Sequence, residues 1–513
     1  MKRQMKIAAV VSATALLAIG ASFTSMAAAK TGTWAQEDGV WYCYDKNGDV
    51  YENEFCMSNG VELYVGEDGE LVTNSWVEHD GNMYYIGSAG TKTINAWKEL
   101  TPYEDEDADT EWYYFGAAGK RVENTKKAIA SDVYGTETFY FDGEGKVIYG
   151  WVEKTAAGYE QADGDEVVKD LIYTNERGAR VEKRWFQAYE PSVNVEEDDL
   201  DGVSQKWYYA KSLGSLVNGK QNSITGATYL FNNDCEMVTG WVAADATEGF
   251  IAIDTEDVHG ALSTYDAVYY TCDVDGHVKK GQWIYDYANT NWENDPDKSK
   301  YYFFIEKDGK VFVPAKASES NTCVATDANA VDFVDGEISV ATDSDDIFED
   351  SMVRIIDNNK YLFNADGQMM TGLKYFGGNY YYFGKSTDGA MKTGAQTIAD
   401  SYGDEYKFYF GTEDSSEKDY IKGAGVTGNA NGKLYKNGLL VTANGEYKYD
   451  LVTLTIDGKD AQFIVNKNGS IQTSKNDYKD DSEVIIDLTD VEFVKANGAK
   501  KDSIAEGEAK KNF

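Results

Sequence analysis

The sequence predicts an all-β fold, an elongated β-solenoid-like array of stacked β-hairpin repeats. A motif of two or three aromatic residues, a few polar residues and a glycine returns along most of the 513 residues. The chain contains 38 Tyr and 49 Gly but 4 Pro. Aromatic residues favour strands, and Gly, Asn and Asp favour the turns between them. One long array therefore replaces the three or four domains that the length alone suggests.

Each copy of the motif is expected to form one hairpin. An aromatic strand leads into a turn glycine, and a short strand returns after it, as at 145–149 and 309–313. A lone two-stranded hairpin is marginal in water, so neighbouring hairpins should bury their aromatic faces against each other. A conventional β-sandwich is the alternative, but it does not explain the recurrence. The clearest copies lie at 41–48, 83–90, 112–119, 139–145, 207–214, 268–276, 301–309, 361–367 and 380–389.

The spacing of the turn glycines predicts how the array is divided. Gly48, Gly69 and Gly90 are 21 residues apart, whereas Gly90 and Gly119 are 29 apart. The added residues are acidic and polar, which is typical of loops inserted on one side of a repeating frame. We expect a repeat array with acidic insertions at 30–313, a degenerate repeat or break at 314–355, a second array at 356–475 and a charged segment at 476–513.

The first 29 residues have the pattern of a secretory signal peptide. Lys2, Arg3 and Lys6 precede an apolar stretch at 7–19, and small residues at 26–29 offer a cleavage site. The apolar stretch is too short for a stable membrane span. We therefore expect a secreted protein without a membrane span.

The charge balance excludes one class of partner. The chain has 88 Asp and Glu against 48 Lys and Arg, a net charge of −40, which repels nucleic-acid phosphates. Three His leave little room for His-based metal or acid–base chemistry. We predict no nucleic-acid partner, no metal site and no cofactor, and no oligomeric state is predicted.

The five cysteines leave alternatives open. Cys43 could pair with Cys56 and Cys235 with Cys272, which leaves Cys323 over. Equally, all five could be reduced and serve as small apolar residues.

The sequence lacks the signature of an enzyme. It contains no zinc-protease, serine-hydrolase or P-loop motif. The repeats leave no uninterrupted stretch of about 100 residues, the size of a typical domain. We therefore predict that the protein is not an enzyme and has no catalytic residues.

The ends of several repeats carry a more specific pattern. It reads Asp-Gly-Ala-Met-Lys-Thr-Gly at 388–394, Asp-Gly-Gln-Met-Met-Thr-Gly at 366–372 and Cys-Glu-Met-Val-Thr-Gly-Trp at 235–241. This pattern resembles the cell-wall-binding repeat family, the choline-binding and glucan-binding repeat proteins of Gram-positive bacteria, over roughly residues 31–475. The resemblance implies a β-solenoid of hairpins with ligand sites between units. In choline-binding relatives such a site is a cage of two Trp and one Tyr, sometimes with Met.

Three candidate cages follow from this resemblance, each with two Trp and a Tyr from the next hairpin. Aromatic faces hold a quaternary ammonium by cation–π attraction, and flat sugar faces also stack on them. For every ring the alternative is a place in the core between hairpins. The three sets are Trp34, Trp41 and Tyr64; Trp97, Trp112 and Tyr140; and Trp185, Trp207 and Tyr229.

We therefore hypothesise a secreted surface protein that binds cell-envelope choline or glycan noncovalently. Its partner would be bacterial cell-wall choline or polysaccharide, and it would be associated with the cell wall. The alternative is a structural or adhesive surface array that binds host or matrix glycan or protein, with every aromatic residue in the core.

Overall fold

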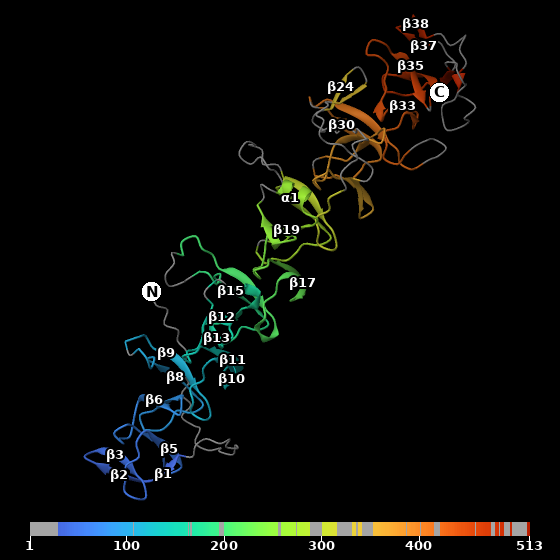
Figure 1. Ribbon diagram of the computed structural model, residues 1–513. Helices are drawn as coiled ribbons and strands as arrows, with labels where there is room; N and C mark the ends of the chain where they lie inside the picture. The colour runs from blue at the N-terminus through green and yellow to red at the C-terminus, as the bar shows by residue number, and fades with distance from the viewer. Residues whose placement is uncertain are drawn as a thin grey trace. The chain divides into compact units, whose positions relative to one another are not determined.

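The computed structural model describes residues 29–105, 107–162, 164, 167–193, 200–254, 258–272, 274–287, 300–314, 331–334, 337–340, 352–385, 387–400, 402–414, 421–456, 458–472, 478–481, 483–486, 493–494 and 510–512. The expected signal peptide lies outside the described residues except for its last position. The described chain divides into two units, of which unit 1 comprises residues up to 238 with 247–250, and unit 2 the remainder. Figure 1 labels their elements.

Unit 1 consists of short antiparallel hairpins. The strands are β1 (Lys30–Thr31), β2 (Thr33–Glu37), β3 (Val40–Tyr44), β4 (Glu54–Ser58), β5 (Val61–Val65), β6 (Ser75–His79), β7 (Asn82–Ile86), β8 (Ala96–Leu100), β9 (Glu111–Phe115), β10 (Thr125–Ser131), β11 (Gly135–Phe141), β12 (Gly150–Lys154), β13 (Tyr159–Gln161), β14 (Ile172–Thr174), β15 (Arg184–Ala188), β16 (Lys206–Ala210), β17 (Gly219–Ile224) and β18 (Ala227–Phe231). Two 3₁₀ turns lie at Val168–Asp170 and Ser212–Gly214.

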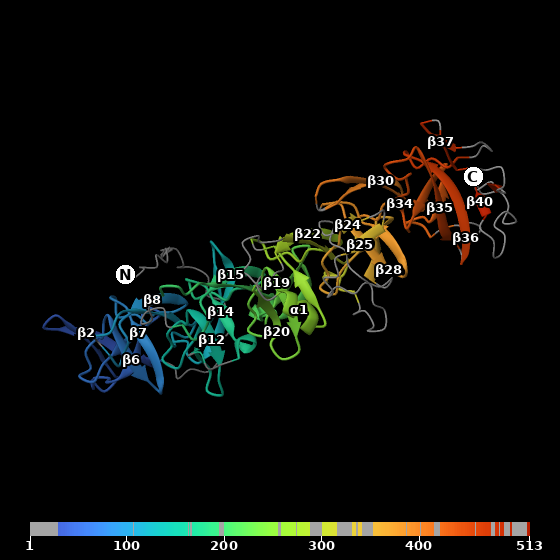
Figure 2. The same ribbon diagram turned by 90° about the horizontal axis from the view of Figure 1, so that it is seen from above.

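Unit 2 continues with hairpins and ends in two larger sheets. Its elements are β19 (Trp241–Asp245), β20 (Gly249–Ile253, whose first two residues belong to unit 1), α1 (Val258–Thr264), β21 (Val268–Tyr270), β22 (Gln282–Tyr287), β23 (Lys300–Ile305), β24 (Val331–Val334), β25 (Glu337–Val340), β26 (Val353–Ile356), β27 (Asn359–Leu362), β28 (Leu373–Phe376), β29 (Asn379–Tyr382), β30 (Gly394–Ala399), β31 (Glu405–Phe410), β32 (Gly428–Ala430), β33 (Lys433–Lys436), β34 (Leu439–Leu440), β35 (Tyr449–Ile456), β36 (Lys459–Asn466), β37 (Tyr478–Asp480), β38 (Glu483–Ile486), β39 (Phe493–Val494) and β40 (Lys510–Asn512). Strands β30, β31, β34, β33 and β32 form one sheet. Strands β35, β36, β40 and β39 form another, and Figure 2 shows β35 and β36 side by side.

The prediction of an all-β class is confirmed, with the addition of the short helix α1. Stacking into an elongated solenoid stays a prediction, as does the division of the chain at 314–355. Hairpin β24–β25 lies within 314–355, and most other residues of that segment fall outside the described ones.

The hairpins differ from the predicted form in where they turn. Most aromatic strands pair with the strand directly before them, as β3 pairs with β2 through Asp38 and Gly39, whereas β14 pairs with β12 and β21 with β19. Asp38 and Gly39 have φ of 47° and 91°, which is the tight type I′ turn that an Asp-Gly pair favours. After the motif's own glycine, Gly48, the chain makes a single bridge between Tyr44 and Val50 instead of a second full strand pair.

Successive hairpins of unit 1 pack through alternate faces of their strands. On β9, Tyr113 faces back, and its ring centroid lies 4.9 Å from that of Trp76 on β6. Its neighbour Tyr114 faces the other way and contacts Trp97, which in turn packs 4.9 Å from Phe139 on β11. Because side chains alternate along a strand, each hairpin covers its two neighbours with opposite faces.

Backbone hydrogen bonds tie neighbouring hairpins together as well. The amide two residues after a motif glycine donates to a carbonyl of the preceding hairpin. Arg121 N lies 2.8 Å from Met83 O, and Val147 N lies 3.0 Å from Trp112 O. This bond recurs at matching positions and therefore fixes which residues of consecutive hairpins are equivalent.

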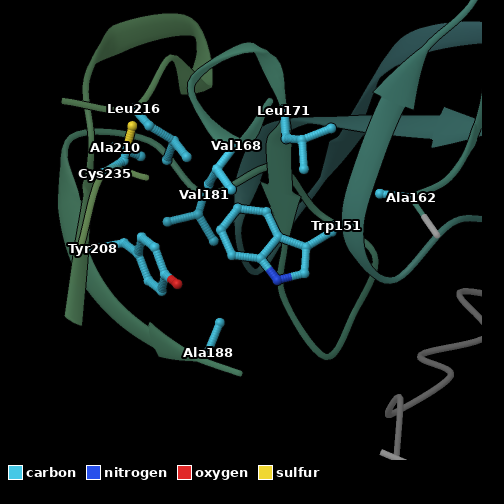
Figure 3. Close-up of a cluster of buried hydrophobic side chains, with 10 residues drawn as sticks. All are labelled: Trp151, Ala162, Val168, Leu171, Val181, Ala188, Tyr208, Ala210, Leu216 and Cys235. Carbon is cyan, nitrogen blue, oxygen red and sulfur yellow. The ribbon is translucent and has the colours of Figure 1, made fainter. Parts of the chain in front are cut away.

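The largest core cluster of unit 1 shows the same arrangement. Figure 3 shows the Trp151 indole surrounded by apolar side chains that include Leu171, Val181 and Tyr208. The centroids of Trp151 and Tyr208 are 5.1 Å apart, with the rings at 80°. The indole N–H donates to Tyr189 O at 2.8 Å. Aromatic rings in edge-to-face contact thus supply much of the buried apolar area.

Candidate ligand-binding site

The structure brings together all three residues of the third predicted set. The ring of Trp185 lies 6.4 Å from that of Trp207, with the planes at 83°. It lies 4.7 Å from Tyr229, with the planes at 60°. Trp185 therefore contacts both other rings, and the two indole planes meet at close to a right angle, which forms a corner of the kind in which aromatic rings receive a cation.

Strand register explains how two distant tryptophans share a face. Strand β15 pairs with β16 so that Trp185 lies opposite Tyr209 and Gln187 opposite Trp207. Residues two apart on a strand point the same way, so all four side chains lie on one face of the hairpin. The exposed amide of Gln187 adds a hydrogen-bonding group beside Trp207.

The next hairpin supplies the opposite wall. Tyr229 and Phe231 share a face of β18, and the Phe231 ring stacks on Trp185 at 5.7 Å and 19°. Met237 packs against the same cluster, and its N–H donates to Trp207 O at 2.8 Å. The thioether is polarisable and suits contact with a soft cation.

Exposure differs strongly among the three predicted residues. Trp207 is 41% exposed, Trp185 is half-buried, and Tyr229 is 4% exposed. Tyr229 therefore forms the buried base of the corner, and Trp207 lies at its rim, where the indole is accessible from solvent. Its exposed surface is apolar and is available to stack on a ligand.

The carboxyl group of Glu236, the residue before Met237, has a raised pKa. Burial raises the pKa of the Glu236 carboxyl above its ordinary value, and the nearby Glu190 adds to that effect. The Asn232 side-chain amide donates to Glu236 Oε2 at 2.8 Å and opposes the rise in pKa. The Tyr208 hydroxyl donates to the other oxygen at 3.4 Å.

The first predicted set is not brought together. Trp34 and Trp41 share a face of hairpin β2–β3, and Trp34 donates to Met57 O at 3.1 Å. Tyr64 instead points to the other side of β5, where its ring contacts Phe55 at 4.9 Å. Leu63 occupies the position that corresponds to Tyr229, six residues before the turn residue in both hairpins. The wall opposite Trp34 is therefore aliphatic.

In the second set, as in the first, the predicted tyrosine lies one residue after the position that corresponds to Tyr229. Trp97 and Trp112 pack in one cluster with Phe139, which corresponds to Tyr229. Tyr140 is fully buried on the opposite face of β11, and its hydroxyl accepts a hydrogen bond from Arg180 at 3.1 Å. The ligand-binding role of all nine predicted residues stays a prediction.

Sequence reasoning did not single out Met237 or Tyr209 for the site. Met237 had a usable signal, because it is the Met of the Cys-Glu-Met-Val-Thr-Gly repeat end at 235–240. Tyr209 belongs to the Trp-Tyr-Tyr run at 207–209, in which the register selects the first and third rings and excludes Tyr208.

Unit 2 contains a separate cavity of about 380 Å³. Its lining includes Tyr265, Phe312 and the ion pair of Arg354 with Glu306, whose Nη2 and Oε1 are 2.5 Å apart. The Arg354 guanidinium carbon lies 5.0 Å from the Phe312 ring centroid. A cation of the chain thus already covers the aromatic wall of this cavity.

Across the part of the chain that the structure describes, no group of three or more His, Cys, Asp or Glu side chains is placed to hold a metal ion. Within those same residues, no helix has the length and apolar character needed to cross a membrane.

Comparison with known proteins gives partial matches. No protein-family model matches the sequence. Over 154 residues the chain is 28% identical to glucosyltransferase-S of Streptococcus mutans. That match covers 26% of this chain and 10% of the relative, so the chain spans about a tenth of the curated protein that it matches.

Solved structures give longer but weaker matches. CbpJ of Streptococcus pneumoniae is 18% identical, with 68% of this chain and 98% of that chain covered and a TM-score of 0.36. The choline-binding domain of CbpL from the same species is 20% identical, with 44% of this chain and 100% of that chain covered and a TM-score of 0.27. The proteins that this chain is similar to thus include a choline-binding domain and a glucosyltransferase.

Proposed function

We propose that the protein is a secreted surface protein that binds cell-envelope choline or glycan noncovalently through its aromatic hairpin repeats. The observation that carries this proposal is the corner formed by Trp185, Trp207 and Tyr229. Its walls are π faces and a thioether, which suit a quaternary ammonium or the flat face of a sugar ring. The proposed role is binding without catalysis, at the cell wall.

The chemistry of the corner favours a soft cation. A quaternary ammonium offers no hydrogen-bond donor, so its recognition depends on ring faces, at about 0.5–2 kcal/mol per ring. The net charge of −40 attracts a cation, although at physiological salt this attraction reaches about 8 Å. Three walls together support a weak but specific site.

Retention on isolated cell walls tests the proposal. We expect the protein to bind choline-containing walls and to elute with free choline. Retention that choline does not reverse, but that soluble wall polysaccharide does, would assign the same corner to glycan. Absence of retention on both walls and polysaccharide would contradict the proposal.

One observation favours the alternative of a structural or adhesive array. Several rings are entirely core, since Trp241 is 2% exposed and Tyr113 is 1% exposed. If all rings serve this purpose, the partner would be host or matrix glycan or protein, bound by the acidic outer loops. Substitution of Trp207 distinguishes the two, because an exposed ring can leave the core intact and still remove a ligand contact.

A further inference from the structure

A lysine of the chain itself lies over the aromatic rings between hairpins β4–β5 and β6–β7. Lys92 Nζ is 4.8 Å from the ring centroid of Phe55 and 5.6 Å from that of Tyr84. The ammonium also forms an ion pair with the Glu62 carboxylate. The Lys92 side chain is 8% exposed, so this cation is almost completely enclosed.

Lys92 occupies the position that Met237 has in the Trp185 corner. Each lies two residues after the motif's turn residue, Gly90 or Cys235. The Lys92 N–H donates to Glu62 O, as that of Met237 donates to a carbonyl of its own preceding hairpin. By the same register Phe55 corresponds to Trp185, Tyr84 to Tyr229 and Glu62 to Trp207.

The following hairpin closes over the lysine stem. A Cβ on Gly119 would lie 2.4 Å from Lys92 Cγ and 2.5 Å from Cδ. Gly119 has a φ of +77°, so the turn both needs glycine and brings its backbone against the stem. The enclosed lysine is therefore held from one side by rings and from the other by backbone.

The next pair of hairpins repeats the arrangement with arginine. Arg121 lies two residues after Gly119, and its guanidinium carbon is 5.8 Å from the Trp76 ring centroid. Its Nε and Nη2 donate to Glu123 Oε2 at 3.0 and 2.7 Å. Two consecutive cages thus contain a basic side chain at the same repeat position.

We propose that Lys92 is an internal cation that occupies the place of a ligand ammonium and closes this cage to cationic ligands. The residue two positions after the turn then determines which cages are open: Lys92 and Arg121 close theirs, and Met237 leaves its corner open to solvent. This assignment goes beyond the proposed function, because it depends on the Phe55, Tyr84 and Glu62 geometry and not on choline binding at Trp185.

Chemical rescue tests this proposal. Lys92→Ala removes the three carbons and the ammonium that n-propylammonium would replace. The measurement is the thermal midpoint of the full chain titrated with n-propylammonium chloride, and separately with choline chloride. All variants carry Trp207→Ala, so a ligand at the proposed site does not contribute. Lys120→Ala, which replaces an exposed lysine next to Gly119, is the matched control.

We expect n-propylammonium to raise the midpoint of Lys92→Ala saturably, by at least about 2 °C, and to leave the parent and Lys120→Ala unchanged. Sodium chloride and 1-propanol should not reproduce the rise, because the first lacks the organic stem and the second lacks the charge. Choline should give a smaller rise. Equal responses of Lys92→Ala and Lys120→Ala, or equal rescue by 1-propanol, would overturn the proposal.

A second variant covers the case in which Lys92→Ala alone does not fold. Lys92→Ala with Glu62→Gln leaves no uncompensated carboxylate in the emptied cage. We expect it to fold and to retain an ammonium-specific rise, reduced because the ion pair is absent. Lack of any ammonium-specific rise in this variant would also overturn the assignment, whatever the outcome of the cell-wall retention experiment.

Discussion

Trp97 and Phe139 belong to consecutive hairpins, and their ring centroids lie 4.9 Å apart with an interplanar angle of 67°. Tyr140, the next residue on the same strand, points away from Trp97 and is buried on the other face. This contact illustrates how unit 1 is held together, since one ring of each hairpin inserts between rings of the next. It also shows which side chains of β11 lie on the same face as the candidate cage and which lie on the opposite, buried face.

A double-mutant cycle between Trp97→Leu and Phe139→Leu measures this relationship. Because the rings meet edge to face, we expect a coupling energy of about 0.5–1.5 kcal/mol. The control cycle pairs Trp97→Leu with Tyr140→Leu and should give a coupling near zero. Comparable coupling in both cycles would show that the face assignment on β11 is incorrect.

The two most deeply buried indoles should respond differently to loss of the N–H. Trp151 Nε1 donates to Tyr189 O at 2.8 Å, whereas Trp241 Nε1 is buried and has no hydrogen-bond partner among the described residues. We expect Trp151→Phe to cost about 1 kcal/mol more than Trp241→Phe, because the first substitution also leaves a carbonyl unpaired.

Native-state hydrogen exchange at amides of β12 and β19 reports these local opening free energies. Both variants lose similar ring volume, so each serves as the control for the other. A larger cost for Trp241→Phe would contradict the prediction.

Glu236 should make local stability depend on pH. Its pKa is raised by burial, so the folded protein keeps this proton to a higher pH than the unfolded chain does. Stability contributed by the protonated form is therefore present at low pH. This stability is lost as the pH rises from the ordinary pKa of a Glu side chain through the raised pKa of Glu236 in the folded protein.

The Glu236→Gln variant keeps an acceptor and removes the titration. Relative to this variant, the wild type should lose stability as the pH rises from the ordinary pKa of a Glu side chain, about 4.3, to the raised pKa in the folded protein, with no further change above it. Denaturation midpoints of both proteins across this range provide the measurement. Parallel pH profiles of the two proteins would show that Glu236 does not titrate as described.

The cysteines should divide into reactive and inert groups. Cys43, Cys56 and Cys235 are buried free thiols, and Cys272 is half-buried. Burial raises the pKa of the Cys235 thiol to about 12, and also raises those of Cys43 and Cys56. Since the thiolate is the nucleophile, these three should react slowly in the folded protein.

A thiol-reactive chromogenic disulfide reports these rates in the Cys323→Ser variant, because Cys323 lies outside the described residues. We expect one equivalent of thiol, Cys272, to react in the folded state and four after denaturation. Rapid reaction of all four without denaturant would contradict the buried placement.

The hairpin repeats could be predicted because their signals are local. The aromatic strand and the glycine turn at 41–48 appear in the structure as β3 and a positive φ of 89° at Gly48. The main pairing partner differs from the expected one, because the Asp38–Gly39 turn pairs the aromatic strand with the preceding strand, and the expected partner after the glycine makes a single bridge. The glycine at the end of the motif recurs in every clear copy, so the sequence indicates a turn there more strongly than at the two residues before the aromatic strand.

The site was predictable in part, because its members come from different hairpins. Trp185 and Trp207 share a face through a register that the repeat spacing implies. The position of the third ring could not be predicted, because Tyr64 and Tyr140 each lie one residue later in their hairpin than Tyr229 does in its own. Side chains alternate along a strand, so this difference of one residue places both on the opposite face. Lys92 had a signal: it stands two residues after Gly90, where the repeat at 388–394 has Met.

The choline affinity of matched tryptophan variants shows whether the Trp185 corner binds a ligand. Trp207 and Trp41 are at the same repeat position and are 41% and 43% exposed, but in the hairpin that follows Trp41 the position of Tyr229 is taken by the aliphatic Leu63. We expect Trp207→Ala to weaken choline binding about tenfold, roughly the loss of one desolvated ring, and Trp41→Ala to leave it unchanged. Equal affinities of wild type and Trp207→Ala, or an equal loss in both variants, would contradict this prediction.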